Sequence, residues 1–498
     1  MSKAVKVIAG IVIVVGAVAS GGAWYTGTRV EGVIRDAVEQ ANHELAQRMV
    51  GDNGPAHLDV VSVDRHVFSS DIRYKLVLEG AHFRVDGKPL ELDFADHLEH
   101  GPLPWSRVRA LDLVPVMVAS HFDLVRTPTT EKWFAATHDA APLQGRAVVG
   151  YDRNTVLDIK LLPFAVDDAG HPMHFSGATA QVKYGDDGKR LDTTGSLDAL
   201  QLTLPTRGGP MNLQVNGFTF SSGGTKGRSG FYLGHTDGKV ALLSGQVQGQ
   251  PAIQFKDFTS ASLLQEVDGN LAGQVNYDVG MINVGGKEVG SSHMAGKFSN
   301  FDITASQALV DFYQTKVLPQ AAAAQAARAG GQPYDLHLTD ADQLQLSNEL
   351  TALLAGKPHV ELENLSLKTT HGESQASLML DLTNPGTFDQ PADDLYKKMV
   401  AEFKAQVLLS KPMIGDLVTL QAQSQGMTDP AALAKQAQGT ADGVAGMAQV
   451  FGLAKVEGDN IVSRLHYVDG MVDFNGQKMT PEQFAAVMMA KVGQLAPH

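Results

Sequence analysis

The stretch of this sequence that comes closest to an enzyme site is Asp96-His97-Leu98-Glu99-His100. Inverse zinc proteases use H-x-x-E-H on a helix, where two histidines one turn apart bind the metal and the glutamate acts as the base. Here the motif is one residue short, it follows an alternating strand pattern, and Gly101 and Pro102 come directly after it. Histidines with structural or solvated roles therefore fit this stretch better than a metal site.

Two other chemical patterns are incomplete. Gly372-Glu373-Ser374-Gln375-Ala376 approaches the serine nucleophile elbow, but it lies at a predicted hairpin instead of a strand-to-helix turn. Gly296-Lys297 is followed by Phe298 and lacks the first glycine of a phosphate-binding loop. The sequence therefore predicts no catalytic residue, no metal ligand and no cofactor. A hydrolase whose carboxylates meet only in three dimensions stays open as an alternative.

Composition removes further classes of function. The 498 residues contain 40 Lys and Arg against 54 Asp and Glu, a net charge of −14, with no concentrated basic surface for nucleic acid. The absence of cysteine excludes disulfides, zinc fingers and thiol nucleophiles. The 51 glycines and the low aromatic content of 7% suit many short strands joined by tight turns.

One uncharged run near the start predicts a membrane anchor. Val7 to Tyr25 contains no charged residue, and a helix of this length is about 28 Å long, close to the roughly 30 Å hydrocarbon core of a bilayer. Lys3 and Lys6 precede it on the side that stays cytoplasmic, which places the rest of the chain outside the cytoplasm. The predicted anchor (residues 1–28) includes two interfacial aromatic residues at its end, and its named positions are Val7, Ile11, Val15, Trp24 and Tyr25.

A cleaved signal peptide is the alternative for the same run. Ala17-Val18-Ala19 before Ser20 is a pattern that signal peptidase accepts. Against cleavage, the uncharged run continues past that point to Tyr25, which is longer than the apolar region of a signal peptide. Both interpretations export the chain, and only the first keeps it anchored.

Residues 29–50 predict an amphipathic helix directly after the anchor. Their apolar residues recur every three or four positions, which is the helical period, at Val30, Ile34, Val38, Ala41, Leu45 and Met49. The apolar side either packs on the chain's own β-structure or forms an oligomer face. The residues of the possible oligomer face are Ile34, Val38, Ala41 and Leu45.

From His57 the hydrophobic period changes to two. Ile72, Tyr74, Leu76 and Leu78 share one face of a predicted strand, and further alternating runs separated by turns continue to about residue 300. Residues 57–300 therefore predict a mainly antiparallel β region, much of it a long meander. The fold class is α+β, mostly antiparallel β, with a transmembrane helix at the N-terminus and helices in the C-terminal part.

Residues 301–498 predict a mixture of helices and strands. Helical patterns begin at Thr304 and again in ADQLQLSNELTALLAGKP, and a hairpin turns at His371-Gly372. Two more helices are expected at about 413–423 and 430–451. Thr480, Pro481 and Gln483 then form a typical helix start.

Short strings across the chain also resemble one family. GGAWYTG (21–27), VFSS (67–70), HGP (100–102), GMAQVFGL (446–453) and NGQKM (475–479) are similar, in order and separation, to the YdgA-like family of bacterial envelope proteins. The resemblance implies a single-pass protein of the bacterial inner membrane with its bulk in the periplasm. It implies no catalytic residues, because the activity of the family is not established.

These observations predict a non-enzymatic binding or scaffolding module of the cell envelope. Its expected partners are the lipid bilayer through the N-terminal helix, a second copy of the chain in a homo-oligomer, or another envelope protein. The alternative is handling of a lipid or other hydrophobic ligand, because a sheet with one apolar face must cover it with protein or with ligand.

Overall fold

The computed structural model describes residues 35, 38, 39, 42, 45, 56–80, 84, 85, 88–168, 171–185, 188–206, 208–320, 324 and 337–495. Within those residues no helix has the length and apolar character needed to cross a bilayer. The predicted anchor Val7–Tyr25 lies outside the described residues. The chain divides into two compact units, 1–202 with 217–234 and 309–343, and 203–216 with 235–308 and 344–498.

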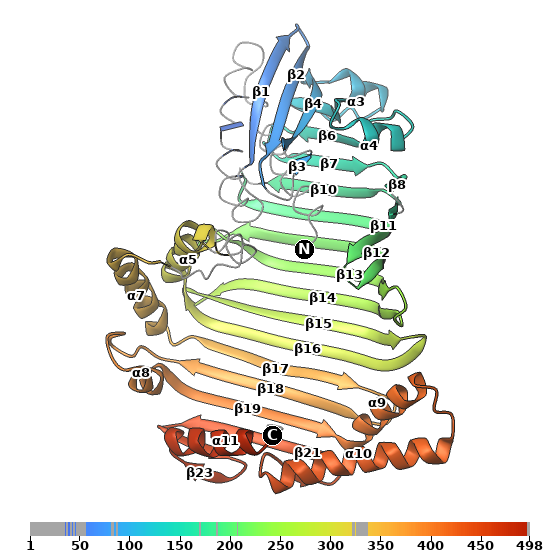
Figure 1. Ribbon diagram of the computed structural model, residues 1–498. Coiled ribbons are helices and arrows are strands. Elements are labelled where there is room, and N and C mark those ends of the chain that lie inside the picture. Colours follow the sequence, from blue (N-terminus) through green and yellow to red (C-terminus); the bar gives the residue numbers. More distant parts are fainter. Residues whose placement is uncertain are drawn as a thin grey trace. The chain divides into compact units, whose positions relative to one another are not determined.

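The first unit consists mainly of short antiparallel strands (Figure 1). Its elements are β1 (Ala56–Arg65), β2 (Ser69–Leu78), β3 (Arg84–Val85), β4 (Lys88–His100), α3 (Trp105–Arg109), β5 (Val118–Leu124), α4 (Glu131–Ala136), β6 (Leu143–Val149), β7 (Thr155–Leu161), β8 (Phe164–Asp168), β9 (His171–Phe175) and β10 (Ala178–Gly185). The main ladder runs β1–β2–β4–β5–β6–β7–β10, every pair antiparallel.

Five regular elements contribute residues to both units. They are β11 (Arg190–Thr206), β12 (Gly209–Lys226), β13 (Tyr232–Val247), α5 (Ile303–Phe312) and α7 (Asp340–Ala355). A short π-helix, Tyr313–Val317, follows α5, so the helix predicted from Thr304 to Leu318 is present with a change of pitch at its end.

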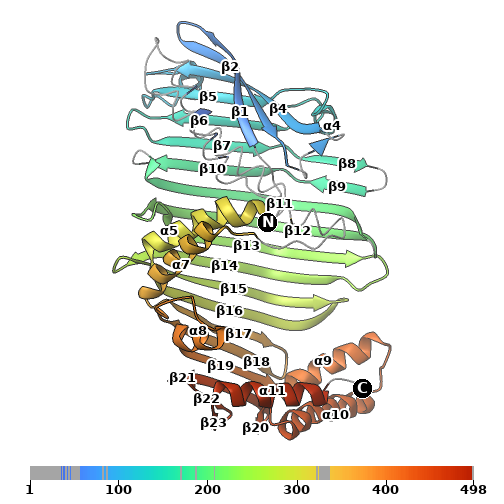
Figure 2. The same ribbon diagram turned by 60° about the vertical axis from the view of Figure 1, so that its left-hand side comes forward.

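The second unit is a meander with helices near its end (Figure 2). Strands β14 to β19 pair in chain order, and β21 follows β19. Its elements are β14 (Ile253–Val267), β15 (Asn270–Val284), β16 (Lys287–Asp302), β17 (His359–Lys368), β18 (Glu373–Leu382), α8 (Ala392–Met399), β19 (Val400–Ser410), α9 (Lys411–Ser424), α10 (Pro430–Val450), β20 (Lys455–Glu457), β21 (Asn460–Val468), β22 (Met471–Phe474), β23 (Gln477–Met479) and α11 (Pro481–Leu495).

The mostly antiparallel β fold is therefore confirmed, and the helices predicted around 413–423 and 430–451 are α9 and α10. Both begin with a side-chain cap followed by a proline near the first position: Ser410 accepts from the Met413 N–H, and Asp429 accepts from the Ala431 N–H.

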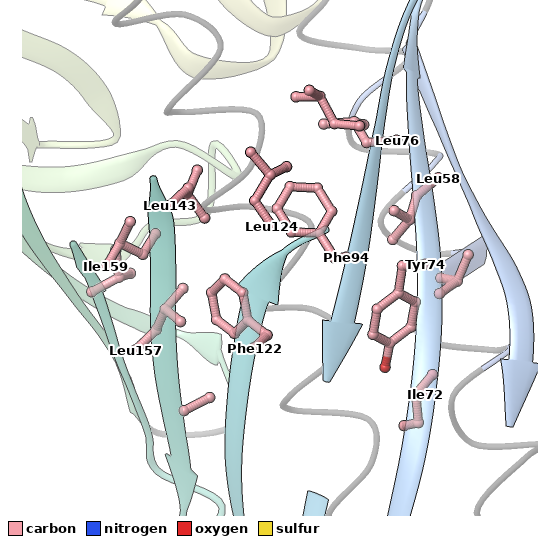
Figure 3. Close-up of a cluster of buried hydrophobic side chains, with 14 of the residues drawn as sticks. Leu58, Ile72, Tyr74, Leu76, Phe94, Phe122, Leu124, Leu143, Leu157 and Ile159 are labelled. Carbon is pink, nitrogen blue, oxygen red and sulfur yellow. The ribbon is translucent and has the colours of Figure 1, made fainter. Parts of the chain in front are cut away.

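One large hydrophobic core lies on the inner face of the first unit (Figure 3). Ile72, Tyr74, Leu76 and Leu78 are all buried, as the period of two predicted, and side chains from β4 to β7 meet them. Gly145 is required here, because a Cβ at that position would lie 1.9 Å from the ring of Phe122 on the neighbouring strand.

A helical segment before β1 covers part of this core. Val38 and Leu45 belong to the buried cluster, and Leu45 is 0% exposed. Asn42 fixes the segment to β1: its amide nitrogen donates to the Leu58 carbonyl at 2.9 Å, and its amide oxygen accepts from the Leu58 N–H at 2.7 Å. Since β1 pairs only with β2 among the described strands, Asn42 satisfies backbone groups on an open sheet edge.

Among the residues that the structure describes, Asp96 is the one buried carboxylate, and it lies inside this core. Its side chain is 6% exposed, and Ser120 Oγ donates to Asp96 Oδ1 at 2.6 Å. Burial raises the pKa of Asp96 to about 6, although the Ser120 hydrogen bond opposes this. The same burial, with the nearby Asp96 charge, raises the pKa of Tyr74.

We expect Asn42→Ala to lower the free energy of unfolding by about 2 kcal/mol, because it leaves the N–H and carbonyl of Leu58 unpaired at a buried site. Thermal unfolding of the purified chain measures the effect. Glu39→Ala, an exposed change on the same segment, is the control and should stay within about 0.5 kcal/mol of wild type. Equal unfolding midpoints for the two variants would contradict the role of Asn42.

We expect the wild type to lose stability as the pH rises from about 4 to about 6, because folded Asp96 holds its proton to a higher pH than the unfolded chain does. The loss is about 3 kcal/mol, and it persists at neutral pH. Asp96→Asn should remove it while keeping an acceptor for Ser120, so this variant should unfold at a higher temperature at pH 7.5. The exposed control Asp64→Asn should not raise the unfolding temperature. An Asp96→Asn variant that is less stable than the wild type at pH 7.5 would refute the raised pKa of Asp96.

Candidate functional site: an apolar sheet face

The register of strands β14 to β21 separates their side chains by chemistry. On β16, β17 and β18 the paired residues Met294, Leu365 and Ala376 lie on one face. The adjacent row, His293, Ser366 and Gln375, lies on the other. We call the first side the apolar face. From β15 to β21 it carries Val275, Tyr277, Val279, Met294, Phe298, Val360, Leu362, Leu365, Leu367, Leu378, Leu380, Phe403, Val407, Leu409, Ile461, Leu465 and Tyr467.

The middle of the apolar face is open. Leu365 is 43% exposed and Val407 is 40% exposed, values that are high for aliphatic side chains in central strands. We define the apolar strip as five residues of this face on β15 to β19: Tyr277, Met294, Leu365 and Val407, which share one row with Ala376, and Leu378, which lies two residues along β18 from Ala376. With strands about 4.8 Å apart, the strip is roughly 19 Å long.

Towards β21 and β22 the same face passes under helices. Phe484 of α11 contacts Phe474 with ring centroids 5.4 Å apart, and Met488 joins the same cluster. Figures 1 and 2 both show α11 lying across this end of the sheet. A recess remains between α8, α11 and the strands, lined by Tyr396, Val400, Phe403, Tyr467, Val472, Pro481 and Phe484.

Local interactions hold α11 in this position. The predicted helix start at Thr480 is confirmed as a capping box, in which the Thr480 N–H donates to Gln483 Oε1 at 2.9 Å and Thr480 Oγ1 accepts from the Gln483 N–H at 3.3 Å. Lys397 of α8 forms an ion pair with Glu482 of α11, and this bond lowers the pKa of Glu482 to about 2. The ion pair joins the two helices that border the recess.

The opposite face of the second unit carries ion pairs between neighbouring strands. His293 Nδ1 lies 2.6 Å from Asp278 Oδ1, Lys297 Nζ lies 2.9 Å from Glu361 Oε2, and His359 Nδ1 lies 2.6 Å from Asp381 Oδ1. Such pairs suit contact with water. The sheet is therefore amphipathic, with its polar side solvated and its apolar side only partly covered.

This arrangement can bind an apolar molecule, and it presents no nucleophile with an adjacent base. In the part of the chain that the structure describes, no three His, Cys, Asp or Glu side chains are grouped as metal ligands. The site is built from aliphatic and aromatic side chains, whose contribution is burial of apolar surface.

The histidines of the enzyme-like stretch, His97 and His100, do not point to the same site. Alternation along β4 places His97 on the outer face, where its Nδ1 lies 2.6 Å from Asp71 Oδ1. His100 is on the inner side, with Nε2 3.0 Å from Ser70 Oγ, and burial lowers its pKa. Two histidines on opposite faces of a strand cannot share a metal, which agrees with structural roles.

The other chemical patterns also have structural roles. Ser374 is buried, and its Oγ accepts a hydrogen bond from the Ser410 N–H at 2.9 Å. Lys297 lies within β16 and pairs with Glu361 and Glu363, so Gly296-Lys297 is part of a strand.

The predicted anchor residues and two residues of the possible oligomer face, Ile34 and Ala41, lie outside the described residues. Val38 and Leu45, from the same predicted face, pack into the chain's own core. The oligomer face itself stays a prediction.

Sequence reasoning did not single out the residues of the apolar strip. The signal was the alternation in HVELENLSLKTTHGESQASLMLDL, which predicted the hairpin of β17 and β18 correctly. The register between strands was missing, and it alone aligns Leu365 with Tyr277 and Val407 and places Leu378 on the same face.

We expect His359→Gln to destabilise the chain at acidic pH only. Burial opposes the charged imidazole, but hydrogen bonds to Asp381 and Glu361 outweigh it and raise the pKa of His359. A histidine whose pKa is raised by folding stabilises the fold at pH values below its unfolded pKa of about 6.5. This stabilisation is lost as the pH rises through the pKa of the folded state. The wild type should therefore exceed the variant by roughly 0.5 kcal/mol at pH 5.5 in thermal unfolding and match it at pH 8.5. A difference that grows with pH would contradict this.

Comparison with known proteins gives matches along nearly the whole chain. It is 24% identical to Protein YdgA of Escherichia coli strain K12 over 497 residues, which cover 98% of this chain and 97% of that protein. It is 22% identical to Uncharacterized protein YihF of the same strain over 488 residues, covering 96% and 98%. A protein of Haemophilus influenzae described as uncharacterized is 27% identical over 159 residues, covering 32% of this chain and 42% of that one.

No solved structure matches this chain. The family of bacterial proteins of unknown function called DUF945 matches residues 1–482. The resemblance to the YdgA-like family is thereby confirmed, and the chain belongs to the DUF945 family.

Proposed function

We propose that this protein is a membrane-anchored envelope protein that binds the acyl chain of a lipid on its apolar face, without catalysing a reaction and without a cofactor. The observation that carries the proposal is the open apolar strip, which leads towards an apolar recess beneath α8 and α11. Each methylene group moved from water onto such a surface contributes about 0.8 kcal/mol.

A flexible chain fits this surface better than a folded partner does. The recess is lined by three strands and two helices, and an ion pair between Lys397 and Glu482 joins the two helices. A flat protein face could cover the strip but could not enter the recess. A lipid tail can follow both, because it is narrow and adapts by rotation about its bonds.

The proposed location rests on the sequence. Val7 to Tyr25 has the length and apolar character of a single membrane crossing, and Lys3 and Lys6 favour retention of the preceding end in the cytoplasm. In this proposal the two β units lie in the periplasm, beside the bilayer that supplies the lipid.

A scaffolding role is the competing class within the same proposal. The helix at 29–50 was its candidate contact, but Val38 and Leu45 are already buried against the chain's own strands. These two residues of the predicted face are thus occupied within the chain, whereas the apolar strip is exposed. Ligand binding is therefore the better supported of the two.

Photocrosslinking tests the proposal with the full chain in native membranes. We expect a photoreactive phenylalanine analogue at Leu365 to give adducts with the mass of a phospholipid, detected by mass spectrometry of the labelled peptide. Leu378→Glu, on the same face of the next strand, should reduce these adducts several-fold, because it places a charge in the strip.

Ser377→Glu is the matched control, since it adds the same charge one residue away on the opposite, polar face of β18. It should leave the adducts unchanged. Adducts of Leu365 with a second copy of the chain would instead show that the strip is a dimer contact. Absence of lipid adducts, or equal effects of the two glutamates, would refute lipid binding at the strip.

A further inference from the structure

A second apolar surface lies at one end of the first unit and does not belong to the apolar strip. The turn between β1 and β2 exposes Val67 and Phe68, and the loop between β4 and β5 exposes further large apolar residues. A hydrogen bond from the His100 N–H to the Phe68 carbonyl, at 2.8 Å, holds the two segments together. We call this set the apolar tip: Val67, Phe68, Leu103, Trp105, Leu111, Leu113 and Val114.

The base of the tip is well fixed. Gly101 N–H donates to the Met117 carbonyl at 2.7 Å, so the backbone hydrogen bonding continues past the ends of β4 and β5. Glu99 accepts from the Ser106 N–H at 2.9 Å at the start of α3. Arg107 spans the loop, with its guanidinium 2.8 Å from Asp112 and also bonded to the Val114 carbonyl.

Although the base is fixed, the apolar side chains point into solvent. Leu111 is 85% exposed and Phe68 is 79% exposed. Leu111 also has φ 58°, a left-handed conformation that costs a leucine roughly 1–2 kcal/mol. This conformation ends α3: the Leu111 N–H donates to the Val108 carbonyl at 3.0 Å and the Asp112 N–H to the Arg107 carbonyl at 2.9 Å, the pattern of a Schellman cap. The cap directs the loop so that Leu111 stands in solvent beside the other exposed apolar residues of the tip, and a cluster of this kind suggests a contact outside the chain.

We propose that the apolar tip inserts into the interfacial region of a phospholipid bilayer. Trp105 is largely exposed and has the Arg109 guanidinium 5.4 Å from its ring centroid, a pairing suited to the interface, where an amphipathic ring and a cation both find partners. Protruding side chains enter a bilayer without needing a complementary hollow, which a protein partner would have to supply.

The reach of the chain fits this occupant. Only 17 positions separate Tyr25, the end of the predicted anchor, from Asn42, which is bonded to Leu58 in the strand that leads to the tip. The 4 steps from Tyr25 to Arg29 span at most about 14 Å when extended and the 13 steps of the predicted helix from Arg29 to Asn42 about 20 Å, together close to the roughly 33 Å from Leu58 to Phe68 along β1 and the turn after it. This step rests on the proposed anchor. The contact between the apolar tip and the bilayer does not depend on that anchor. Because the chain has a net charge of −14, the contact works by insertion of apolar side chains and not by attraction to anionic lipid.

The absence of cysteine makes the test direct. Leu111→Cys or Phe68→Cys in the full chain is labelled with an environment-sensitive fluorophore and mixed with vesicles of phosphatidylethanolamine and phosphatidylglycerol that carry a lipid-bound quencher. The control is Lys132→Cys. Lys132 is exposed on α4, which comes after β5 in the chain, whereas both loops of the apolar tip come before β5. We expect several-fold stronger quenching at both tip positions than at the control.

Flotation of the same samples with vesicles reports on the anchor separately. Flotation without selective quenching at the tip overturns the inference and leaves the anchor. If the fluorophore at the tip is selectively quenched in a chain that lacks residues 1–28, insertion of the tip is supported even if the anchor proposal fails. Equal quenching at Leu111 and Lys132 overturns the inference whatever the flotation shows.

Discussion

Alternation of side chains along antiparallel strands is the constraint on which the rest of this structure depends. Each strand sends every second side chain to the same face, so a sequence with apolar residues at alternate positions must produce a sheet with two chemically different sides. The polar side needs only water and ion pairs. The apolar side has to be covered, and the two units differ in how completely they do so.

In the first unit the cover is nearly complete. Val38 and Leu45 from the preceding helical segment, together with Phe134 from α4, join the strand residues in one buried cluster. The core is tight enough that Gly145 has no space for a side chain beside Phe122. It also encloses Asp96, whose buried carboxyl binds Ser120. Seven of the large apolar residues that remain exposed in this unit lie on two adjoining loops, the apolar tip.

In the second unit the cover is partial. Helix α11 seals the face over β21 and β22 through Phe484 and Met488. It stops short of the middle strands, where Leu365 and Val407 remain accessible. The opposite face carries His and Lys side chains paired with carboxylates, and these pairs suit contact with water. Exposed apolar surface that is continuous over several strands often marks a binding site in proteins.

Much of the fold was predictable from the sequence, because it depends on local patterns. The period of two in Ile72, Tyr74, Leu76 and Leu78, the turn at His371-Gly372 and the capping box at Thr480 each involve neighbours a few residues apart. The spacing of Asp96 to His100, one residue short of the metal-binding motif, was also visible in the sequence, but the histidines lie within β4 and do not follow the strand as expected.

The apolar strip and the apolar tip were decided by the tertiary structure. Tyr277, Leu365 and Val407 become neighbours only through the register of five strands, and the tip exists because a hydrogen bond joins Phe68 to His100 across 32 residues. The burial of these residues could not be predicted from the sequence either, because the apolar alternation of a strand is the same whether or not a helix covers it. The sequence by itself determined which residues alternate. Long-range pairing determined which of them meet, and helix placement determined which remain open.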